Sequence, residues 1–309
     1  TLGLVTQNQK EHLSLMNFLE SFFMIGILTG SFLFGYFVDD NNPKSQSWLN
    51  AYYILAAIAA AAFLLLLTTK LDESSVKKAE FEESKDLSDD FLGMLRLIVK
   101  PLVLIFIFSV FFYVLIEQSI MSWLPTFNND VLHLSTSLSI QMATILSASF
   151  AVGRFLAGIA FKKIDWLYVL LGCLVIAAAI VLITVPLTKG LAVGTIKSIA
   201  DVPMVAFAFP MIGLFLAPIY PAVNSVILSQ LPKHKHAAMT GLIVIFSALG
   251  GTTGSIITGH IFDAYDGQTA FYFSLIPMGL LIVLLFFFKR LQSKSGTETT
   301  AVNITGGGH

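Results

Sequence analysis

The stretch Gly26–Asp39 reads GILTGSFLFGYFVD, and the later stretch Gly250–Asp263 reads GGTTGSIITGHIFD. The two share six identities in fourteen aligned positions, all of them glycine, serine, threonine or aspartate. Shared hydrophobicity does not explain these matches, because the identical residues are small or turn-forming rather than apolar. A fainter third copy keeps the five-residue glycine spacing at Gly153 and Gly158. The pattern therefore indicates a fold built from repeated helical units.

The composition around the repeat places the protein in a membrane. Of 309 residues, 56% are hydrophobic and only 12% are charged, about half the charged fraction of a soluble domain. Several apolar runs also exceed the roughly 18 residues that span a bilayer. The net charge of -1 gives no reason to expect a nucleic-acid partner. We predict an all-α integral membrane protein that is surrounded mainly by the lipid bilayer.

Eight apolar segments are long enough to cross about 30 Å of hydrocarbon as helices. Turn-forming and charged residues separate them. The predicted spans are Leu13–Val38, Trp48–Thr69, Leu102–Phe127, Ser135–Phe161, Trp166–Pro186, Val202–Leu231, Ala238–Phe262 and Ala270–Phe288.

The basic residues predict the orientation. Fourteen of the eighteen lysines and arginines fall on one side of the predicted spans, three fall on the other, and Arg154 lies within a span. Such an excess marks the cytoplasmic side. We therefore expect a multi-pass protein of the plasma (inner) membrane with both chain ends in the cytoplasm. No signal peptide precedes the first span, and the chain begins with Thr1, so we expect a truncated start.

The repeat also predicts the domain organisation. Spans one and two resemble spans seven and eight, and spans seven and eight are the last two of a six-span set. Spans one and two should therefore be the last two of an earlier six-span set, of which four helices are missing. The predicted parts are residues 1–69, the end of the first half; 70–100, a charged cytoplasmic linker with a short amphipathic helix; 101–291, the second six-helix half; and 292–309, a disordered cytoplasmic tail. Two six-helix halves joined by a linker are the major facilitator architecture, with eight of twelve transmembrane helices present.

Several short motifs carry a closer resemblance. In chain order they are Asn17, Glu20-Ser21-Phe22 and Gly26; Tyr113-Val114 and Ser122-Trp123-Leu124; Gly153-Arg154-Phe155; and Tyr220-Pro221. By their order and spacing the chain resembles the fucose:proton symporter branch of the major facilitator superfamily. The resemblance implies proton-coupled sugar uptake by two rocking halves, with a monosaccharide and protons as partners and a monomeric state.

Polar residues within one span predict a binding wedge. Glu117 lies about 16 Å from the outer boundary, near the midplane, with Gln118 beside it and Tyr113 and Ser122 four residues away on either side of the pair. A carboxylate at that depth costs roughly 2.5–3.5 kcal/mol and normally faces a cavity or a partner. Several donors and acceptors suit a polyhydroxylated ligand. The alternative is a helix–helix hydrogen bond inside the bundle.

The sixth span contains Pro210, Pro218 and Pro221, which remove backbone donors from the helix. A helix interrupted in this way can bend as a gate, and its freed carbonyl groups can face a ligand cavity. We expect Tyr220 and Asn224 to line that cavity. Alternatively, Asn224 satisfies the backbone groups that the prolines free.

Two opposite charges predict a contact between the halves. Glu20 and Arg154 each lie eight residues from the cytoplasmic end of their spans, at a depth of about 12 Å. Paired, they would relieve each other's burial cost and gate the inner side. The competing interpretations are that Arg154 extends alone to the inner surface and that Glu20 binds sugar.

The sequence argues against other classes of function. It has no GxxxxGK[ST] loop for ATP, no paired aspartates and no His-Glu-x-x-His run, so we expect neither an ATP-driven pump nor an enzyme. We expect no cofactor and no metal site. The alternatives are an exporter of drugs or other small metabolites of the same superfamily, or a receptor that does not transport.

Overall fold

The computed structural model describes residues 8–37, 45–69, 98–189, 196, 199–231 and 235–305. These residues are helical apart from turns, connecting segments and an isolated bridge between Leu134 and Ile196. The α-helices are α2 (Gln9–Phe37), α3 (Asn50–Thr68), α6 (Pro101–Asp130), α7 (Thr136–Ala160), α8 (Trp166–Leu187), α9 (Val205–Leu216), α10 (Ile219–Ser229), α11 (His236–Ala264), α12 (Gly267–Phe273) and α13 (Leu275–Thr305).

The eight predicted spans are present, and two of them are divided. The span predicted over Val202–Leu231 is α9 followed by α10, and the last span is α12 followed by α13. Within the described residues, seven helical stretches are long and apolar enough to cross a membrane, and Thr144–Ala160 of α7 is a shorter apolar helix. The chain is a multi-pass integral membrane protein.

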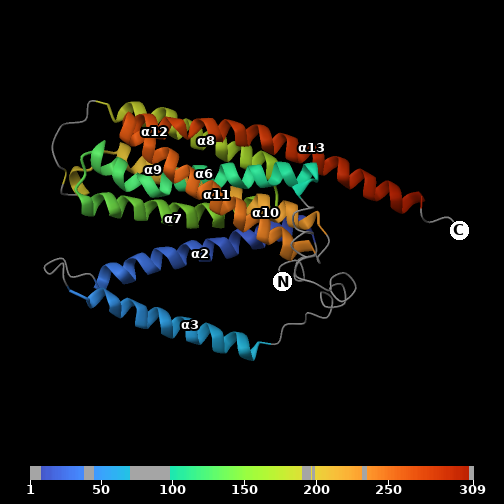
Figure 1. Ribbon diagram of the computed structural model, residues 1–309, viewed down its shortest axis with the longest axis horizontal. Helices are drawn as coiled ribbons and strands as arrows, with labels where there is room; N and C mark the ends of the chain where they lie inside the picture. Colours follow the sequence, from blue (N-terminus) through green and yellow to red (C-terminus); the bar gives the residue numbers. More distant parts are fainter. Residues whose placement is uncertain are drawn as a thin grey trace.

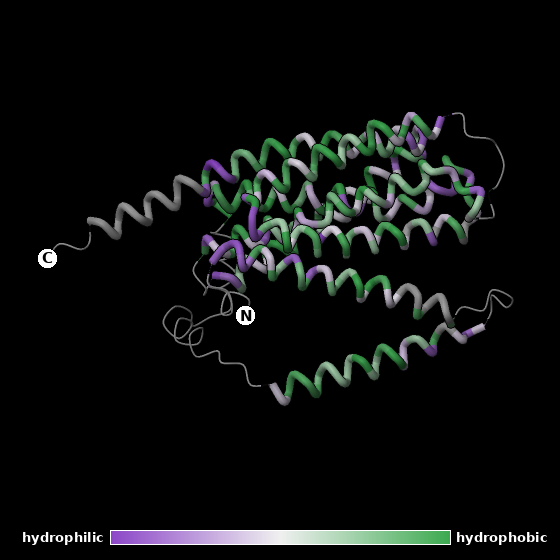
Figure 2. Tube along the Cα trace, turned by 180° about the vertical axis from the view of Figure 1, so that it is seen from behind, coloured by the Kyte–Doolittle hydropathy of each residue, from purple (hydrophilic) through white to green (hydrophobic). Residues whose placement is uncertain are grey.

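Helices α6 to α13 form one bundle, and α2 packs along its side (Figure 1). α2 contacts α7 and α10, whereas α3 lies outside α2 and packs against α2 and the short 3-10 helix Ser47–Leu49. Figure 2 shows hydrophobic residues along most of the length of the helices and hydrophilic ones gathered toward the ends of the bundle. α2 begins and α13 ends at the same end of the bundle (Figure 1).

Polar side chains and one proline fix where several helices begin. Asp165 caps α8 by accepting a hydrogen bond from the Leu167 N–H at 2.9 Å. Ser135 accepts from the Leu138 N–H at the start of α7. α6 starts at Pro101, whose missing N–H is not needed in the first turn of a helix. Chain-local chemistry therefore explains why these predicted boundaries are nearly correct.

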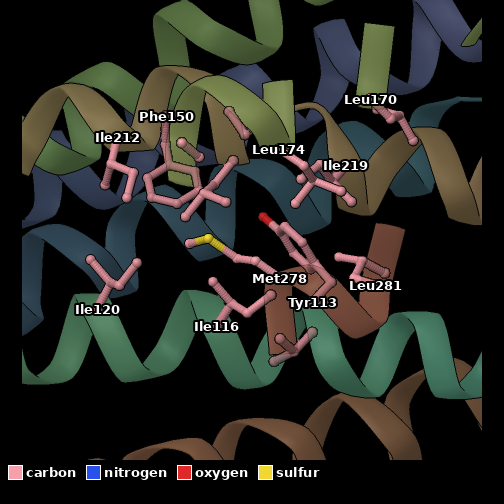
Figure 3. Close-up of a cluster of buried hydrophobic side chains, with 14 of the residues drawn as sticks. Tyr113, Ile116, Ile120, Phe150, Leu170, Leu174, Ile212, Ile219, Met278 and Leu281 are labelled. Atoms are coloured by element: carbon pink, nitrogen blue, oxygen red, sulfur yellow. The ribbon is translucent and has the colours of Figure 1, made fainter. Parts of the chain in front are cut away.

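The bundle core lies between α6 and the helices opposite it. Figure 3 shows Ile116 and Ile120 of α6 facing Phe150 and Ile212, which come from α7 and α9. Tyr113 is fully enclosed in the same cluster, and its hydroxyl points away from the ribbon of α6. A polar group therefore reaches into this buried hydrophobic cluster.

Small residues bring α11 against α6. A β-carbon on Gly250 would overlap the carbonyl oxygen of Phe111, and one on Gly254 would overlap that of Leu115. Gly259 packs in the same way against the ring of Trp123. Glycine at these positions permits backbone-to-backbone approach, as in many membrane helix pairs. The glycines shared by the repeat at 254 and 259 thus have a packing role in the second half.

Two predicted segments differ from the expectation or cannot be compared. The linker of residues 70–100, with its amphipathic helix, lies outside the described residues as far as position 97. Helix α13 extends to Thr305, beyond the predicted start of the tail at position 292.

Candidate substrate site and gate

Arg154 of α7 is the centre of a buried polar cluster. One of its terminal guanidinium nitrogens, Nη1, lies 3.0 Å from Glu20 Oε2 on α2 and also donates to the Glu20 backbone carbonyl at 3.2 Å. The side chain of Arg154 is 3% exposed and that of Glu20 is 25% exposed. The predicted contact between these two residues is confirmed, and Arg154 does not extend alone to a surface.

A broken helix holds the guanidinium from the opposite side. In a regular helix the N–H of residue 221 would bond the Ala217 carbonyl, but Pro221 has no N–H. Arg154 Nε donates to that carbonyl at 3.2 Å. Pro218 likewise leaves the Leu214 carbonyl free of its helical donor, and this carbonyl lies against Gly153, where a β-carbon would overlap it. The motif Gly153-Arg154 therefore docks on the break between α9 and α10, and the Ala217 carbonyl is bonded rather than open to a ligand.

A second carboxylate approaches the same guanidinium. Glu117 Oε1 lies 3.6 Å from Arg154 Nη2 and accepts a hydrogen bond from the Tyr113 hydroxyl at 3.0 Å. The Tyr113 ring stacks on that of Tyr220 with centroids 5.9 Å apart. The Tyr220 hydroxyl in turn accepts from Ser247 of α11 at 3.3 Å. Side chains from α2, α6, α7, α10 and α11 thus form one connected network.

The predicted wedge on α6 divides into two parts. Tyr113 and Glu117 are buried among α7 and α10, so they are the inner part. Gln118 is half-buried and Ser122 is exposed, and the Ser122 hydroxyl lies 3.5 Å from the Gln118 side-chain oxygen. The outer part is therefore the accessible polar surface of this helix.

Asn224 of α10 is a buried polar residue close to the helix break. It is 3% exposed, and its side-chain oxygen has no hydrogen-bond partner among the described residues. The Ala217 carbonyl is bonded by Arg154 instead, so Asn224 does not serve the group freed by Pro221. Asn17 of α2 has a similarly buried, unpartnered side-chain oxygen within the described part of the chain. A role for Asn224 in a cavity stays a prediction.

Short hydrogen bonds join the first part of α2 to the bundle. The Ser14 hydroxyl donates to the Gly158 carbonyl at 2.7 Å, and the Ser21 hydroxyl donates to the Ala151 carbonyl at 2.9 Å. His12 Nδ1 lies 2.5 Å from the Ser225 hydroxyl of α10. His12 comes just before the predicted span Leu13–Val38, but it is a buried residue of α2. These contacts fasten the beginning of α2 to α7 and α10.

The rest of α2 leaves the bundle. Beyond Ser21 the side chains of Phe22 and Phe23 are 70% and 61% exposed, and Met24 is buried. In Figure 1 the distance between α2 and α7 widens toward the end of α2. α2 is thus fastened to the bundle near its beginning and diverges from α7 toward its end.

Comparison with known proteins gives the family. The sequence model described as Major Facilitator Superfamily matches residues 4–211 and 190–303, which together cover most of the chain. The chain belongs to the major facilitator superfamily. The major facilitator fold expected from the repeat is confirmed.

Two solved structures share this major facilitator fold with a TM-score of 0.66 each. One is a crystal structure of FucP, described as a major facilitator transporter in the outward conformation, which is 20% identical; the match covers 92% of this chain and 68% of that one. The other is a variant of the E. coli fucose:proton symporter FucP, which is 19% identical, with 93% and 70% covered. Identities this low show the fold alone.

A curated relative is described as a drug efflux pump. The multidrug efflux pump Tap of Mycolicibacterium fortuitum is 27% identical over 111 residues, which are 36% of this chain and 27% of Tap. The match therefore spans about a quarter of that relative's length.

Sequence reasoning missed two features of the site in this major facilitator chain. The approach of Glu117 to Arg154 was not predicted, because the two residues lie on different helices whose mutual rotation the sequence does not give. The signal for the Arg154–Ala217 bond was available: Pro221 deletes the donor for a buried carbonyl, and a buried carbonyl needs some donor.

Proposed function

We propose that this chain is part of a secondary active transporter that takes up a small sugar together with protons by alternating access. The observation that supports it best is the buried ion pair between Glu20 of α2 and Arg154 of α7. α2 belongs to the first half of the fold and α7 to the second, so the pair crosses the interface that must open and close during transport. Buried charges in a membrane span are costly and are usually functional.

The pair acts as a gate on the cytoplasmic side in this proposal. The excess of basic residues puts the beginning of α2 at the cytoplasm, in the plasma (inner) membrane. The hydrogen bonds of Ser14 and Ser21 then close the inner side, and the divergence of α2 from α7 toward the end of α2 supports an opening toward the outside. The FucP structure described as outward-facing shares this fold and is consistent with that state. Breaking the pair would favour the opposite, inward-facing state.

The sugar would bind on the accessible polar surface next to the gate. Gln118 and Ser122 supply an amide and a hydroxyl from α6, and Tyr220 with its neighbour Ser247 supplies two further hydroxyls. These groups provide both donors and acceptors, as a polyhydroxylated ligand requires. Glu20 is half-buried beside this surface, and Pro218 and Pro221 allow α10 to move relative to α9.

The test is uptake of labelled monosaccharides by the full-length protein in liposomes. Accumulation that requires an inwardly directed pH gradient would support proton-coupled import, and accumulation that is the same without a gradient would contradict symport. Gln118→Ala should raise the sugar concentration for half-maximal uptake, because it removes a donor and an acceptor. Thr240→Ala is the matched control, since this exposed α11 hydroxyl bonds only its own helix at the His236 carbonyl among the described contacts.

A second function rests on the relative Tap. Export of drugs or other small metabolites would be supported if everted vesicles concentrated a cationic dye and no monosaccharide. The polar surface of Gln118, Ser122 and Tyr220 favours a sugar over drugs whose surface is mostly apolar. The two functions are distinguished by which solute moves and by its direction relative to the proton gradient.

A further inference from the structure

Three charged side chains share one buried site, and two of them are acidic. Arg154 contacts both Glu20 and Glu117, which approach it from different helices. We infer that Glu117 is the residue on which the transported proton binds, with Arg154 moving between the two carboxylates as the protein changes state. This inference rests on the proposed function, since it explains how a transporter of this kind would couple to protons.

The charge count of the site supports a bound proton. With both acids ionised, one guanidinium leaves a net charge of -1 at a place where the side chains of Arg154 and Glu117 are only 3% and 11% exposed. The titratable and charged groups that face Glu117 are Tyr113 of its own helix, Arg154 of α7, Glu20 of α2 and, behind Tyr113, Tyr220 of α10. No second cation is among these described neighbours. One proton would make the site neutral and remove the cost of an uncompensated buried charge.

The geometry selects Glu117 rather than Glu20 as the proton acceptor. Glu20 has the shorter contact, 3.0 Å to Nη1 with a hydrogen bond, and its side chain is 25% exposed to solvent. Glu117 is 3.6 Å from Nη2 without a hydrogen bond, and Tyr113 donates to its Oε1. Its Oε2 can therefore carry a proton while Oε1 keeps the bond from Tyr113. The less neutralised and more buried carboxyl is the one that gains most from protonation.

The placement of the three residues couples that proton to movement of the halves. Arg154 is tied to the second half through the Ala217 carbonyl, so it stays there when α2 moves away with Glu20. The guanidinium then needs a new counter-ion, and Glu117 is the acid within reach. Its carboxyl releases the proton to water on the cytoplasmic side and pairs with Arg154 as a carboxylate, while Glu20 becomes hydrated. The proton thus enters from the outside and leaves to the inside, with no other reactant.

Labelling of the unmodified full-length protein tests the assignment. A hydrophobic carbodiimide reacts with protonated carboxyl groups in apolar surroundings, and mass spectrometry identifies the modified residue. We expect label on Glu117, with less label as the pH rises. Label on Glu20 instead, or on neither acid, would overturn the inference. This measurement needs no variant, so poor folding of a mutant cannot obscure it.

Infrared difference spectra between acidic and alkaline buffer give a second readout. Glu117→Gln should abolish the band of a buried protonated carboxyl, whereas the control Asp130→Asn, at the exposed end of the same helix, should keep it. A band that survives in Glu117→Gln would refute the inference. In liposomes, Glu117→Gln should lose the stimulation of uptake by a pH gradient.

The sugar function and the proton site are tested independently of each other. If the unmodified protein is labelled on Glu117 but accumulates no monosaccharide under a pH gradient, the sugar function is wrong and the proton site stands. If it accumulates sugar under the gradient but the label is on Glu20, the sugar function stands and the proton site is wrong.

Discussion

Neutralising the ion pair between Glu20 and Arg154 one residue at a time should cost different amounts of stability. Arg154→Gln removes the partner of two carboxylates and the donor to the Ala217 carbonyl, from a side chain that is 3% exposed. Removing one partner of a buried pair costs about 3–5 kcal/mol. We expect about 3 kcal/mol for Arg154→Gln, at the lower end because its contact with Glu117 is long.

Glu20→Gln should cost less, about 1–2 kcal/mol, because water reaches part of this side chain and Glu117 still neutralises Arg154. The double variant should lose about 1–2 kcal/mol less stability than the sum of the two single losses. This difference is the coupling energy between the contacting charges. Thermal unfolding of the four proteins in detergent at constant pH and salt measures this difference.

Neutral substitutions are better suited to this test than a charge reversal. A glutamate at position 154 would face the Ala217 carbonyl and Glu117, so a swapped pair would be destabilised for reasons unrelated to the pairing. The matched control combines Arg154→Gln with Glu11→Gln. Glu11 is an exposed acid nine residues before Glu20 on α2, and we expect the stability losses of this pair of substitutions to be additive. If the losses of Glu20→Gln and Arg154→Gln add as fully as those of Glu11→Gln and Arg154→Gln, the view that the Glu20–Arg154 contact stabilises the interface is refuted.

Three further predictions follow from packing, capping and the helix break. Gly254→Val should destabilise the protein in thermal unfolding by about 1–3 kcal/mol, because its side chain would overlap the α6 backbone, whereas Gly279→Ala, with open space beside it, should cost nothing. Asp266→Ala should cost about 0.5–1 kcal/mol at neutral pH by removing a helix cap. The backbone N–H of Thr269 holds the pKa of Asp266 below its usual range, so the difference from the unmodified protein should persist until the pH falls below about 4 and then shrink; an undiminished difference at lower pH would contradict this. Pro221→Ala supplies a backbone donor that competes with Arg154 for the Ala217 carbonyl, so gradient-driven uptake should fall although the helix itself becomes more regular; unchanged uptake would show that the Arg154 bond is dispensable.

The positions of the helices could be predicted from local features of the sequence. Span ends coincide with charged and turn-forming residues, and the described helices begin within a few positions of the predicted ones. The exception is instructive. The sequence showed that Pro218 and Pro221 disturb their helix, but only the structure shows that α9 ends and α10 begins around Ala217 and Pro218, where the backbone keeps helical dihedral angles. A proline removes a donor locally, whereas the direction in which the chain continues depends on what packs against it.

The contact between Glu20 and Arg154 could be predicted because depth in a membrane is a one-dimensional quantity. Counting residues from the end of each span gives the depth, and two opposite charges at equal depth have a strong reason to meet. Such counting does not give the rotation of a helix about its axis. For that reason Glu117 was expected to face a ligand with Gln118, although the two side chains lie in different surroundings.

What the sequence alone determined is therefore the set of spans, their repeat and the depth of each polar residue. These properties depend on hydrophobicity, glycine spacing and residue count along one chain. The tertiary structure decided that one guanidinium contacts Glu20, Glu117 and the Ala217 carbonyl together. These contacts require four helices to pack with definite rotations about their axes. The rotations are set by close approaches such as that of Gly153 to Leu214, and neither periodicity nor composition contains this information.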